Sequence, residues 1–315
     1  MPTVCRPRPR RCILPRMATT TLSEQLRVLD GPVDLTSYDS RATPGFAGSK
    51  KDQPDAMAAL AAVLADRQER LYAAGAAGVG DRRVLLVLQG MDTSGKGGTI
   101  RHAAGMLDPQ GVQVTSFKAP TPEELEHDFL WRVERALPSP GRIAIFDRSH
   151  YEDVLIGRVR ALADPAEIER RYDAITAFEK GLVDDGCVVV KCFLHITPDD
   201  QLERLRARLD DPTKHWKYHP ADVDERMLWP RYREAYEVAL ERCSTSYAPW
   251  FVVPSGRKWY RNWAVAQLLA EHLGALDLEW PTADFDVEAE RERLDATATV
   301  GTQAGIGTRS TAPTA

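Results

Sequence analysis

The chain has 315 residues, of which 43% are hydrophobic and 28% are charged, the usage of an ordinary globular protein with enough apolar material for a sizeable core. Its 41 basic and 46 acidic residues give a formal net charge of −5, which argues against a protein that coats nucleic acid, so any polyanion must be bound by a local basic patch. No stretch reaches the roughly 18 consecutive apolar residues of a membrane helix, so neither nucleic acid nor a membrane is expected as a partner.

The two ends of the chain are unlike its middle. The first residues, MPTVCRPRPRRCILPR, are rich in Arg and Pro and contain too short an apolar run for a secretory signal. Residues 1–30 are therefore expected to be a disordered extension. Residues 286–315 end in a weakly apolar, low-complexity stretch and are expected to be a disordered tail. One α/β domain over residues 31–285 remains.

The cysteine content favours a reduced, cytoplasmic protein. The five cysteines are Cys5, Cys12, Cys187, Cys192 and Cys243. Their number is odd, their spacing is scattered and they form no CxxC pair, which is unlike a disulfide scaffold or a zinc site. Cys187 and Cys192 lie in an apolar run and are expected to be buried core thiols.

Between the two ends, apolar strand-like runs alternate with helical patterns. The strands are expected at residues 84–88, 112–117, 143–146, 188–194 and 251–253. The helices are expected at residues 54–73, 123–136, 166–183, 198–209, 224–242 and 259–273. Such alternation is typical of a mostly parallel sheet covered by helices on both faces, so the sequence predicts an α/β fold in three αβα layers.

The first strand, VLLVL, leads into a glycine-rich turn and then into a helical pattern. The turn reads Gly90-Met-Asp-Thr-Ser-Gly95-Lys96-Gly97-Gly98-Thr99. Backbone N–H groups of such a turn point inward around an anion, the helix adds its positive end, and the lysine supplies a mobile charge. The four glycines, Lys96 and Thr99 are therefore candidates for phosphate binding. Gly97 stands where the usual loop has the Ser or Thr that holds magnesium, so the metal ligands are expected mainly among carboxylates, with Thr99 as a partial contributor.

Two aspartates are candidates for holding that metal. Asp92 lies inside the phosphate loop, where bound phosphates would repel its carboxylate unless a divalent cation lay between them. The alternative is an aspartate that stabilises the turn by bonding to its own backbone. Asp147 follows the strand at 143–146, which is the Walker B arrangement, and Arg148 beside it can grip a phosphate through two hydrogen bonds. His150 is expected to be a hydrogen-bonded structural histidine.

A basic segment over about residues 204–226 is expected to form a helical lid. Arg204 and Arg208 are four residues apart and share one face of a predicted helix, and Lys214 and Lys217 follow in a break that contains proline. Converging cations on a helix–loop–helix can close over phosphates, exclude water and neutralise transition-state charge. The alternative is a solvated basic helix face.

Further candidates lie outside this lid helix. Lys118 follows a predicted strand and would lie at the carboxyl edge of the sheet, where ligands of α/β folds bind. Trp216, Tyr218 and Trp229 could stack on a base, but aromatic residues at such positions more often pack, so nucleobase recognition is left unassigned.

These stretches together resemble the type-2 polyphosphate kinase family over about residues 30–280. The resemblance is carried by GMDTSGKGGTIRH, SFKAPTPEELEHDFLWR, FDRSHYEDVL, KHWKYHPADVDER and YAPWFVVPSGRKWYRNW. It implies a P-loop fold related to thymidylate kinases, inorganic polyphosphate as phosphoryl donor or acceptor, adenine or guanine nucleotides as the other substrate, and magnesium. It also implies that Asp92, Lys96, Asp147 and Arg148 are central to catalysis and that the protein forms a dimer or tetramer. The stretch from YDSRATPGF to FDRSHYEDVL is most similar to the branch that phosphorylates AMP and ADP.

A mechanism follows from the chemistry of a nucleotide acceptor. Its terminal phosphate has a last pKa of about 6, so at neutral pH it is already largely an oxyanion and needs no strong general base. Asp92 and Asp147 are then better assigned to Mg²⁺, while Lys96, Arg148 and the lid cations spread the charge of a loose in-line transition state.

Two other functions stay open. One is an ATP-dependent nucleoside or nucleotide monophosphate kinase, against which stand Gly97 in the magnesium position and the number of lid cations. The other is a non-catalytic sensor that binds polyphosphate or nucleotides; the intact Lys96 and Asp147 argue against it.

Overall fold

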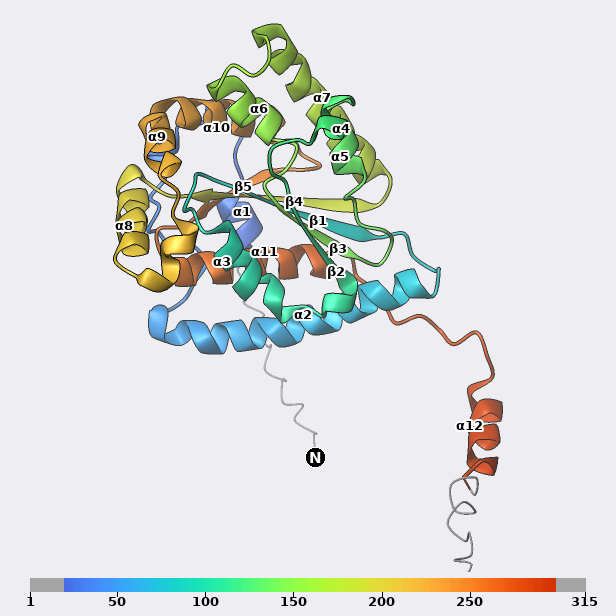
Figure 1. The fold of residues 1–315 in the computed structure, drawn as a ribbon. Coiled ribbons are helices and arrows are strands. Elements are labelled where there is room, and N and C mark those ends of the chain that lie inside the picture. Colours follow the sequence, from blue (N-terminus) through green and yellow to red (C-terminus); the bar gives the residue numbers. More distant parts are fainter. Residues whose placement is uncertain (1–19, 299–315) are drawn as a thin grey trace, which may run out of the picture.

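The central feature of the molecule is a parallel sheet. The computed structural model describes residues 20–298, in which five strands pair side by side (Figure 1). They are β1 Arg83–Gln89, β2 Val112–Ser116, β3 Ile143–Asp147, β4 Cys187–His195 and β5 Trp250–Pro254. Their order is β2-β3-β1-β4-β5, and every neighbouring pair is parallel. Each predicted strand is found within one residue of its expected ends.

The place of each strand in the sheet follows from its side chains. All seven residues of β1, in the centre, are buried, as expected for a strand covered on both faces. The edge strand β2 contains three polar residues and is only partly buried. Cys187 and Cys192 on β4 are buried free thiols, as predicted.

Helices cover both faces of this sheet. In chain order they are α1 Leu22–Leu26, α2 Gln53–Ala76, α3 Lys96–His102, α4 Pro122–Leu125, α5 Trp131–Glu134, α6 Glu152–Val159, α7 Pro165–Asp184, α8 Pro198–Leu209, α9 Ala221–Met227, α10 Trp229–Cys243, α11 Lys258–Gly274 and α12 Val287–Ala296. Leu86 and Leu88 of β1 join the core under α2 and α11. Leu85 and Val87 point the other way, into the core under α6, α7 and α10. Figure 1 shows the resulting three layers, and the predicted αβα sandwich is confirmed.

Two predicted helices are interrupted. The one expected at 123–136 divides into α4 and α5, because the Asp128 carboxylate accepts a hydrogen bond from the backbone of Leu130 at 3.0 Å and the chain turns there. The one expected at 224–242 divides into α9 and α10 at Leu228. Pro230 follows closely, and since proline has no N–H it cannot continue the hydrogen-bond ladder of the preceding helix.

The chain ends differ from expectation where the structure describes them. Residues 20–30, expected to be disordered, contain α1, whose Leu22 and Leu26 are buried. The Glu271 carboxylate on α11 accepts hydrogen bonds from the backbone N–H groups of Leu22 and Ser23 at 3.0 and 2.9 Å. Part of the expected disordered tail forms α12, which is exposed and lies away from the sheet (Figure 1). Residues 1–19 and 299–315, with Cys5 and Cys12, lie outside the described part of the chain.

Within residues 20–298, none of the helices combines the length and the apolar character needed to cross a bilayer.

Candidate active site

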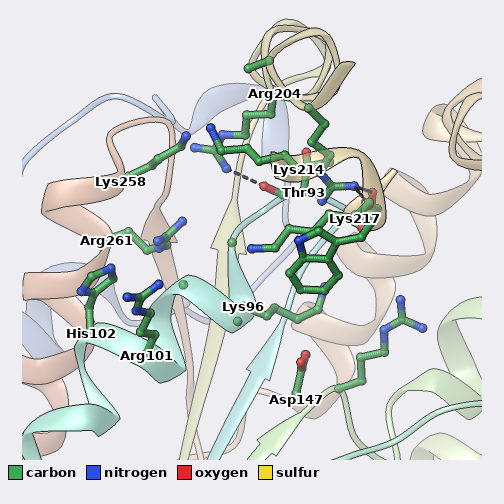
Figure 2. A pocket seen from close by; sticks show the side chains of 18 residues that line it. Thr93, Lys96, Arg101, His102, Asp147, Arg204, Lys214, Lys217, Lys258 and Arg261 are labelled. Atoms are coloured by element: carbon green, nitrogen blue, oxygen red, sulfur yellow. Dashed lines mark hydrogen bonds and ion pairs between the residues drawn. The ribbon is translucent and has the colours of Figure 1, made fainter. Parts of the chain in front are cut away.

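A large cleft opens at the carboxyl ends of β1 and β3. Its volume is about 670 Å³, and α3, α8, α11 and the 3₁₀ segment Pro212–Lys217 form its walls. Among the described residues that line it, nine are cationic and two are acidic. The cations are Lys96, Arg101, Arg148, Arg204, Arg208, Lys214, Lys217, Lys258 and Arg261, and the acids are Asp92 and Asp147. Most of these cations point toward the same space (Figure 2). Such a surface attracts an anion that carries many charges.

The structure brings together eleven of the fourteen predicted site residues. They are Asp92, Gly95, Lys96, Gly97, Gly98, Asp147, Arg148, Arg204, Arg208, Lys214 and Lys217. The cleft therefore joins the glycine-rich turn, the end of β3 and the predicted lid, three segments far apart in the sequence.

The glycine-rich turn has a backbone that few residues other than glycine can adopt. Gly90 and Gly95 have φ angles of 152° and 106°. A side chain on Gly90 would also meet the Leu194 carbonyl oxygen at 2.8 Å, and one on Gly95 would meet the Arg261 guanidinium at 1.7 Å. The two glycines thus permit both the turn and the close approach of a cation behind it.

Lys96 occupies the centre of the cleft. Its ammonium donates a hydrogen bond to the Gly90 carbonyl at 2.9 Å, across the mouth of the turn. Desolvation in the cleft, followed by repulsion from Arg148, lowers the pKa of Lys96, and the attraction of Asp147 only partly offsets this. A bound polyanion would relieve the repulsion between these cations.

Arg204 holds the glycine-rich turn from behind. Its guanidinium donates to the carbonyl oxygens of Thr93 at 2.7 Å and Ser94 at 3.0 Å, and also to that of Ser255. Arg261 donates to the same Ser94 oxygen at 3.1 Å. The sequence predicted Arg204 as a phosphate ligand; in the structure its nitrogens are engaged with the backbone of the loop, so it positions the phosphate cradle.

Arg204 and Arg261 share the Ser94 carbonyl oxygen as an acceptor, and the attraction of Asp200 and Glu203 offsets the burial of Arg204 only in part. Burial, followed by repulsion from Arg204, lowers the pKa of Arg261 to about 10. Burial is also the main cause that lowers the pKa of Arg204. Two destabilised cations behind a phosphate cradle add to its positive potential.

The two aspartates flank Lys96 from different elements. Asp147 ends β3 and is the register partner of Leu88 on β1, which is the predicted Walker B arrangement. The Asp92 carboxylate lies 3.4 Å from Arg208, so in the described part of the chain it reaches across to the lid helix and does not bond to its own turn. Among residues 20–298, no cluster of three or more His, Cys, Asp or Glu forms a ready-made metal site.

The pair Asp92 and Asp147 suits Mg²⁺. This ion is usually held by one or two carboxylates, with waters and substrate phosphates completing its octahedron. Both carboxylates line one cavity together with the phosphate cradle, so a metal bound by them would also contact the phosphates.

The lid is connected to the loop through Arg208. Its guanidinium contacts Asp92 at 3.4 Å and Asp222 of α9 at 3.3 Å, and it donates to the Lys217 carbonyl oxygen at 2.8 Å. One side chain of α8 therefore ties together the phosphate loop, the 3₁₀ segment and α9. The helix face of Arg204 and Arg208 is turned to the cleft, not to solvent.

Three predicted phosphate ligands lie elsewhere. The Thr99 hydroxyl is buried and donates to the Gly95 carbonyl oxygen at 3.2 Å, inside its own helix. Lys118 does not line the cleft; its carbonyl oxygen accepts a hydrogen bond from Arg132 at 2.9 Å. Gly90 lines a second cavity.

Several residues that line the cleft were not predicted from the sequence. Arg101 and His102 come from the end of α3, and Lys258 and Arg261 from the start of α11 (Figure 2). Lys258 and Arg261 could have been predicted from the sequence, because they follow β5 directly. They therefore lie at the carboxyl edge of the sheet, the same edge for which Lys118 was proposed.

The second cavity adjoins the cleft and has a different character. Its volume is about 230 Å³. It is lined by Gly90, Met91, Asp92, Arg148, Glu152, Ile156, Gln201, Glu225, Trp229, Tyr232 and Tyr236. Asp92 and Arg148 also line the cleft and so form the boundary between the two spaces. The aromatic rings of this cavity can accept a planar base, and its carboxylates can accept hydrogen bonds.

A phosphate cradle on a parallel sheet, a Walker B aspartate and a basic helical lid together define a P-loop phosphotransferase. The family model described as polyphosphate kinase 2 matches residues 47–280. The chain belongs to the polyphosphate kinase 2 family.

Individual relatives agree with this assignment. The chain is 46% identical over 252 residues to the AMP/ADP-polyphosphate phosphotransferase of Meiothermus ruber, covering 80% of this chain and 92% of the relative. It is 39% identical to the ADP-polyphosphate phosphotransferase of Rhodopseudomonas palustris, with 82% and 92% covered. The crystal structure of polyphosphate kinase 2 from Arthrobacter aurescens TC1 superposes with a TM-score of 0.86 at 53% identity, covering 88% of this chain and 97% of that one.

Proposed function

We propose that this protein transfers phosphoryl groups between inorganic polyphosphate and adenine nucleotides, converting AMP to ADP and ADP to ATP or the reverse. One observation carries the proposal: in the described part of the chain, nine lysine and arginine side chains and two aspartates line a single cleft. That is more positive charge than the phosphates of one nucleotide need, whereas a polyphosphate chain bears about one negative charge per phosphate along its length. Membership of the polyphosphate kinase 2 family supports the same substrates.

The two cavities suit the two substrates. The polyphosphate chain would occupy the cationic cleft, and the acceptor's base and ribose would enter the smaller cavity beside Trp229 and Tyr232. Their phosphates would then meet at Asp92 and Arg148, which line both spaces. Guanine nucleotides are proposed as further acceptors at the same site.

The residues divide the chemistry among them. The acceptor phosphate is already an oxyanion at neutral pH, so no side chain has to remove a proton. Lys96 and Arg148 would hold the transferred group in line and offset the charge that spreads over its oxygens. Asp92 and Asp147 would hold Mg²⁺, which, when bound, neutralises charge on the donor and acceptor phosphates. Lys214 and Lys217 would close over the chain from the lid.

An ATP-dependent nucleoside kinase is the competing function. Gly97 lacks the hydroxyl that most P-loops offer to the metal, and the cleft extends past the loop to Lys258 of α11. Both features favour a long donor chain over a single triphosphate. An oligomer, a dimer or a tetramer, is proposed from the family and awaits a measurement of mass in solution.

The test is to incubate the purified protein with Mg²⁺ and long-chain polyphosphate and to offer AMP, ADP, GMP and GDP separately. Chromatography should show ADP or ATP, and both products should be lost in Lys96→Ala. Leu162→Ala, at an exposed site that does not line the cleft, serves as the control and should keep full activity. If no nucleotide gained a phosphate, while ATP alone phosphorylated a nucleoside, the competing function would replace this one.

A further inference from the structure

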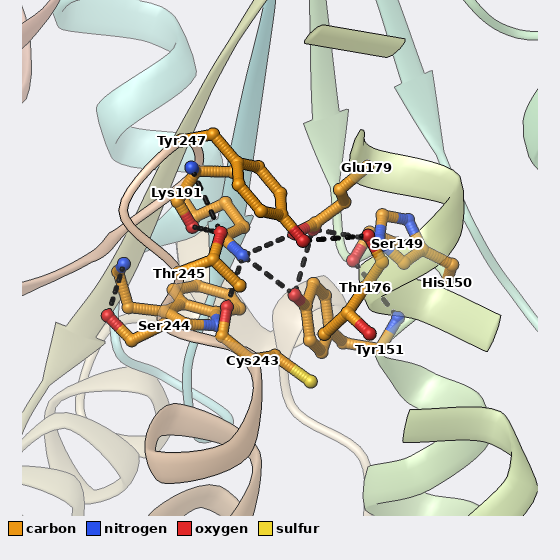
Figure 3. A network of polar contacts seen from close by, with 12 residues as sticks. Ser149, His150, Tyr151, Thr176, Glu179, Lys191, Cys243, Ser244, Thr245 and Tyr247 are labelled. Atoms are coloured by element: carbon orange, nitrogen blue, oxygen red, sulfur yellow. Dashed lines mark hydrogen bonds and ion pairs between the residues drawn. The ribbon is translucent and has the colours of Figure 1, made fainter. Parts of the chain in front are cut away.

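A fully buried ion pair lies behind the active-site turn. Lys191, in the middle of β4, and Glu179, on the inner face of α7, have no exposed side-chain surface, and their charged atoms are 2.5 Å apart. The Lys191 ammonium also donates to the Tyr151 hydroxyl at 2.9 Å and to the Cys243 carbonyl oxygen at 2.7 Å (Figure 3). All three of its donors are thereby used. A charged lysine in the centre of a strand covered on both faces is exceptional.

The ion pair reaches the turn that follows β3. One oxygen of Glu179 accepts a hydrogen bond from the Tyr151 hydroxyl at 2.8 Å and lies 3.3 Å from the His150 ring nitrogen Nε2. His150 is thus the hydrogen-bonded, structural histidine that the sequence predicted. The Lys191 ammonium contributes to lowering the pKa of Glu179 against the opposing effect of burial, which keeps the carboxylate charged.

Ser149, which precedes His150 and Tyr151 in this turn, is fixed from the side of β1. The Ser149 hydroxyl accepts hydrogen bonds from the Gln89 side chain at 3.1 Å and from the backbone of Tyr151 at 3.2 Å. Ser149, His150 and Tyr151 are all buried. Three consecutive residues, placed directly after Asp147 and Arg148, are therefore tied to the interior.

Arg148 needs this support. Its φ angle is 66°, a left-handed conformation that is unfavourable for any residue with a Cβ atom. Such conformations persist where the surrounding structure imposes them, and they cluster at functional sites. On the upstream side the Arg148 N–H donates to the Leu88 carbonyl oxygen at 3.1 Å; on the downstream side the support comes from the buried residues 149–151.

Stability alone does not account for the ion pair. Taking two charges out of water costs about as much as their attraction returns, and replacing a buried pair by apolar residues of similar volume is often neutral or stabilising. Lys191 and Glu179 nevertheless occupy the core position directly behind the turn that bears Asp147 and Arg148.

We propose that Lys191 and Glu179 are positioning residues for phosphoryl transfer. Through Tyr151 and His150 they hold the turn after β3, and so fix the direction in which Asp147 and Arg148 enter the cleft. This inference rests on the proposed function for the roles of those two residues. It assigns no contact with substrate to the ion pair itself.

The first test is the double variant Lys191→Met/Glu179→Leu, which replaces both charged residues by apolar residues of similar volume. We expect kcat to fall by about tenfold or more, the range seen when residues that orient a catalytic group are lost. The KM for polyphosphate should stay within about twofold, because Arg208, Lys258 and most other cations of the cleft do not depend on the turn. The melting temperature should fall only modestly, because both charges are removed together, although the Cys243 carbonyl oxygen loses its donor.

A second readout needs neither substrate nor metal. Hydrogen exchange of the backbone amides in residues 148–152 should become faster in the double variant. Lys180→Ala/Asp184→Ala is the matched control, since this exposed pair lies on the same helix, α7, but faces solvent. It should leave both kcat and the exchange of the turn unchanged.

Tyr151→Phe keeps the test decisive if the double variant fails to fold. It removes only the hydroxyl between the ion pair and the turn, and it should lower kcat while leaving the KM for polyphosphate unchanged. The proposal would be overturned if Tyr151→Phe kept the kcat and the hydrogen exchange of the wild type. It would also be overturned if kcat and the melting temperature fell together while the KM for polyphosphate rose, because that pattern indicates a merely structural role. Wild-type protein that transfers no phosphate would instead remove the proposed function, and the exchange data would still decide whether the pair holds the turn.

Discussion

Lys96 lies in surroundings that disfavour its charged form. Desolvation and the nearby Arg148 lower its pKa, and the attraction of Asp147, Glu152 and Asp92 compensates only in part. A basic group with a lowered pKa loses its proton at a lower pH than a free lysine does, and a polyphosphate chain bound beside it favours the charged form. The free and the substrate-bound enzyme should therefore differ in how they respond to alkaline pH.

We predict two separate alkaline limits. The profile of kcat/KM reports the free enzyme and should decline at a pH below the ordinary lysine value of about 10.4, whereas the profile of kcat reports the complex and should decline at a higher pH. Steady-state kinetics with polyphosphate between pH 7 and 10.5 measure both. The pKa of Lys258 is also lowered, so Lys258→Arg is the control and should retain the limit. Coincident limits, or a limit that disappears in Lys258→Arg, would contradict the assignment to Lys96.

Asp92 is one of the two proposed metal ligands, so its replacement tests whether the reaction depends on a metal held there. Its only charged contact within the described chain is Arg208, at 3.4 Å. We predict that Asp92→Asn lowers kcat by about 100-fold, a typical loss for a group that stabilises transition-state charge, and raises the Mg²⁺ concentration needed for half of the remaining activity.

The matched control for Asp92→Asn is Asp222→Asn. It removes the other carboxylate that contacts Arg208, at 3.3 Å, without changing the cleft's acidic pair. The activity of both variants is measured as a function of the Mg²⁺ concentration. A changed magnesium dependence in Asp92→Asn alone indicates the loss of a metal ligand, whereas the same change in both variants indicates the loss of a partner for Arg208. Near-full turnover with normal magnesium dependence in Asp92→Asn would show that this aspartate does not hold the metal.

At the scale of elements, two of the three arginines on α8, Arg204 and Arg208, have different tasks. Arg204 is 8% exposed and donates to carbonyl oxygens of the phosphate loop. Arg208, one turn later, spans the gap to Asp92 and to α9. A planar guanidinium can reach several carbonyl oxygens at once, whereas the ammonium of lysine is a single point with a different reach.

We predict that Arg204→Lys lowers the free energy of unfolding by about 1–3 kcal/mol, because buried carbonyl oxygens of the loop lose their donors. Arg208→Lys, the control one turn away, should lower activity while changing the free energy of unfolding by less than about 0.5 kcal/mol. Urea unfolding measures both. Equal stability of the two variants would mean that Arg204 does not hold the loop.

The two arginines also show how far the sequence could go. Spacing placed them correctly on one helix face and at one cleft, but it could not tell which would be buried, since this depends on the Ser94 carbonyl oxygen approaching from a loop over a hundred residues earlier. The strands were predictable because each is a bounded apolar run, and the cradle was predictable because its glycines follow a strand. Lys258 and Arg261 were missed because they lie at the start of α11, which follows β5. They reach the cleft only because β5 pairs with β4 in the sheet, and the local sequence does not show this pairing.

Two further features of the fold, a helix break and a short helix, were not predicted from the sequence. The break between α9 and α10 was visible in principle at Pro230, yet a strong helical period on both sides concealed it. Helix α1 is too short to form alone, and it is held by Glu271, almost 250 residues later in the chain. Local sequence therefore predicted most elements that local forces determine, apart from the helix breaks, and it could not show α1, which distant contacts hold.

At the scale of the whole molecule, the cleft concentrates like charges that repel one another. A bound polyanion relieves this repulsion and binds only the folded protein. At a ligand concentration of about 100 times Kd, the linkage adds about 2.7 kcal/mol to the free energy of unfolding, which corresponds to a rise of about 5–10 °C in the melting temperature for a domain of this size.

We predict this rise with polyphosphate at low salt, and a markedly smaller one at 300 mM NaCl, because salt screens the attraction. Orthophosphate at the same phosphorus concentration should have little effect. Lys214→Ala/Lys217→Ala should reduce the rise, whereas Lys50→Ala/Lys51→Ala, a pair of exposed lysines outside the cleft, should not. A rise of equal size at both salt concentrations would argue against a charge-driven cleft.

The strand order has a consequence for how the protein is made. β1 lies in the centre of the sheet, yet both of its neighbours, β3 and β4, come later in the chain. A ribosome that adds 5–20 residues per second needs roughly 3–12 s to pass the sixty or so residues from β1 to β3. For that interval a strand with five consecutive apolar residues, Val84 to Leu88, waits for a partner, and unpaired strands of this kind seed aggregation. We therefore expect the recovered yield to depend on translation rate, growth temperature and chaperone supply more than on the stability of the finished fold.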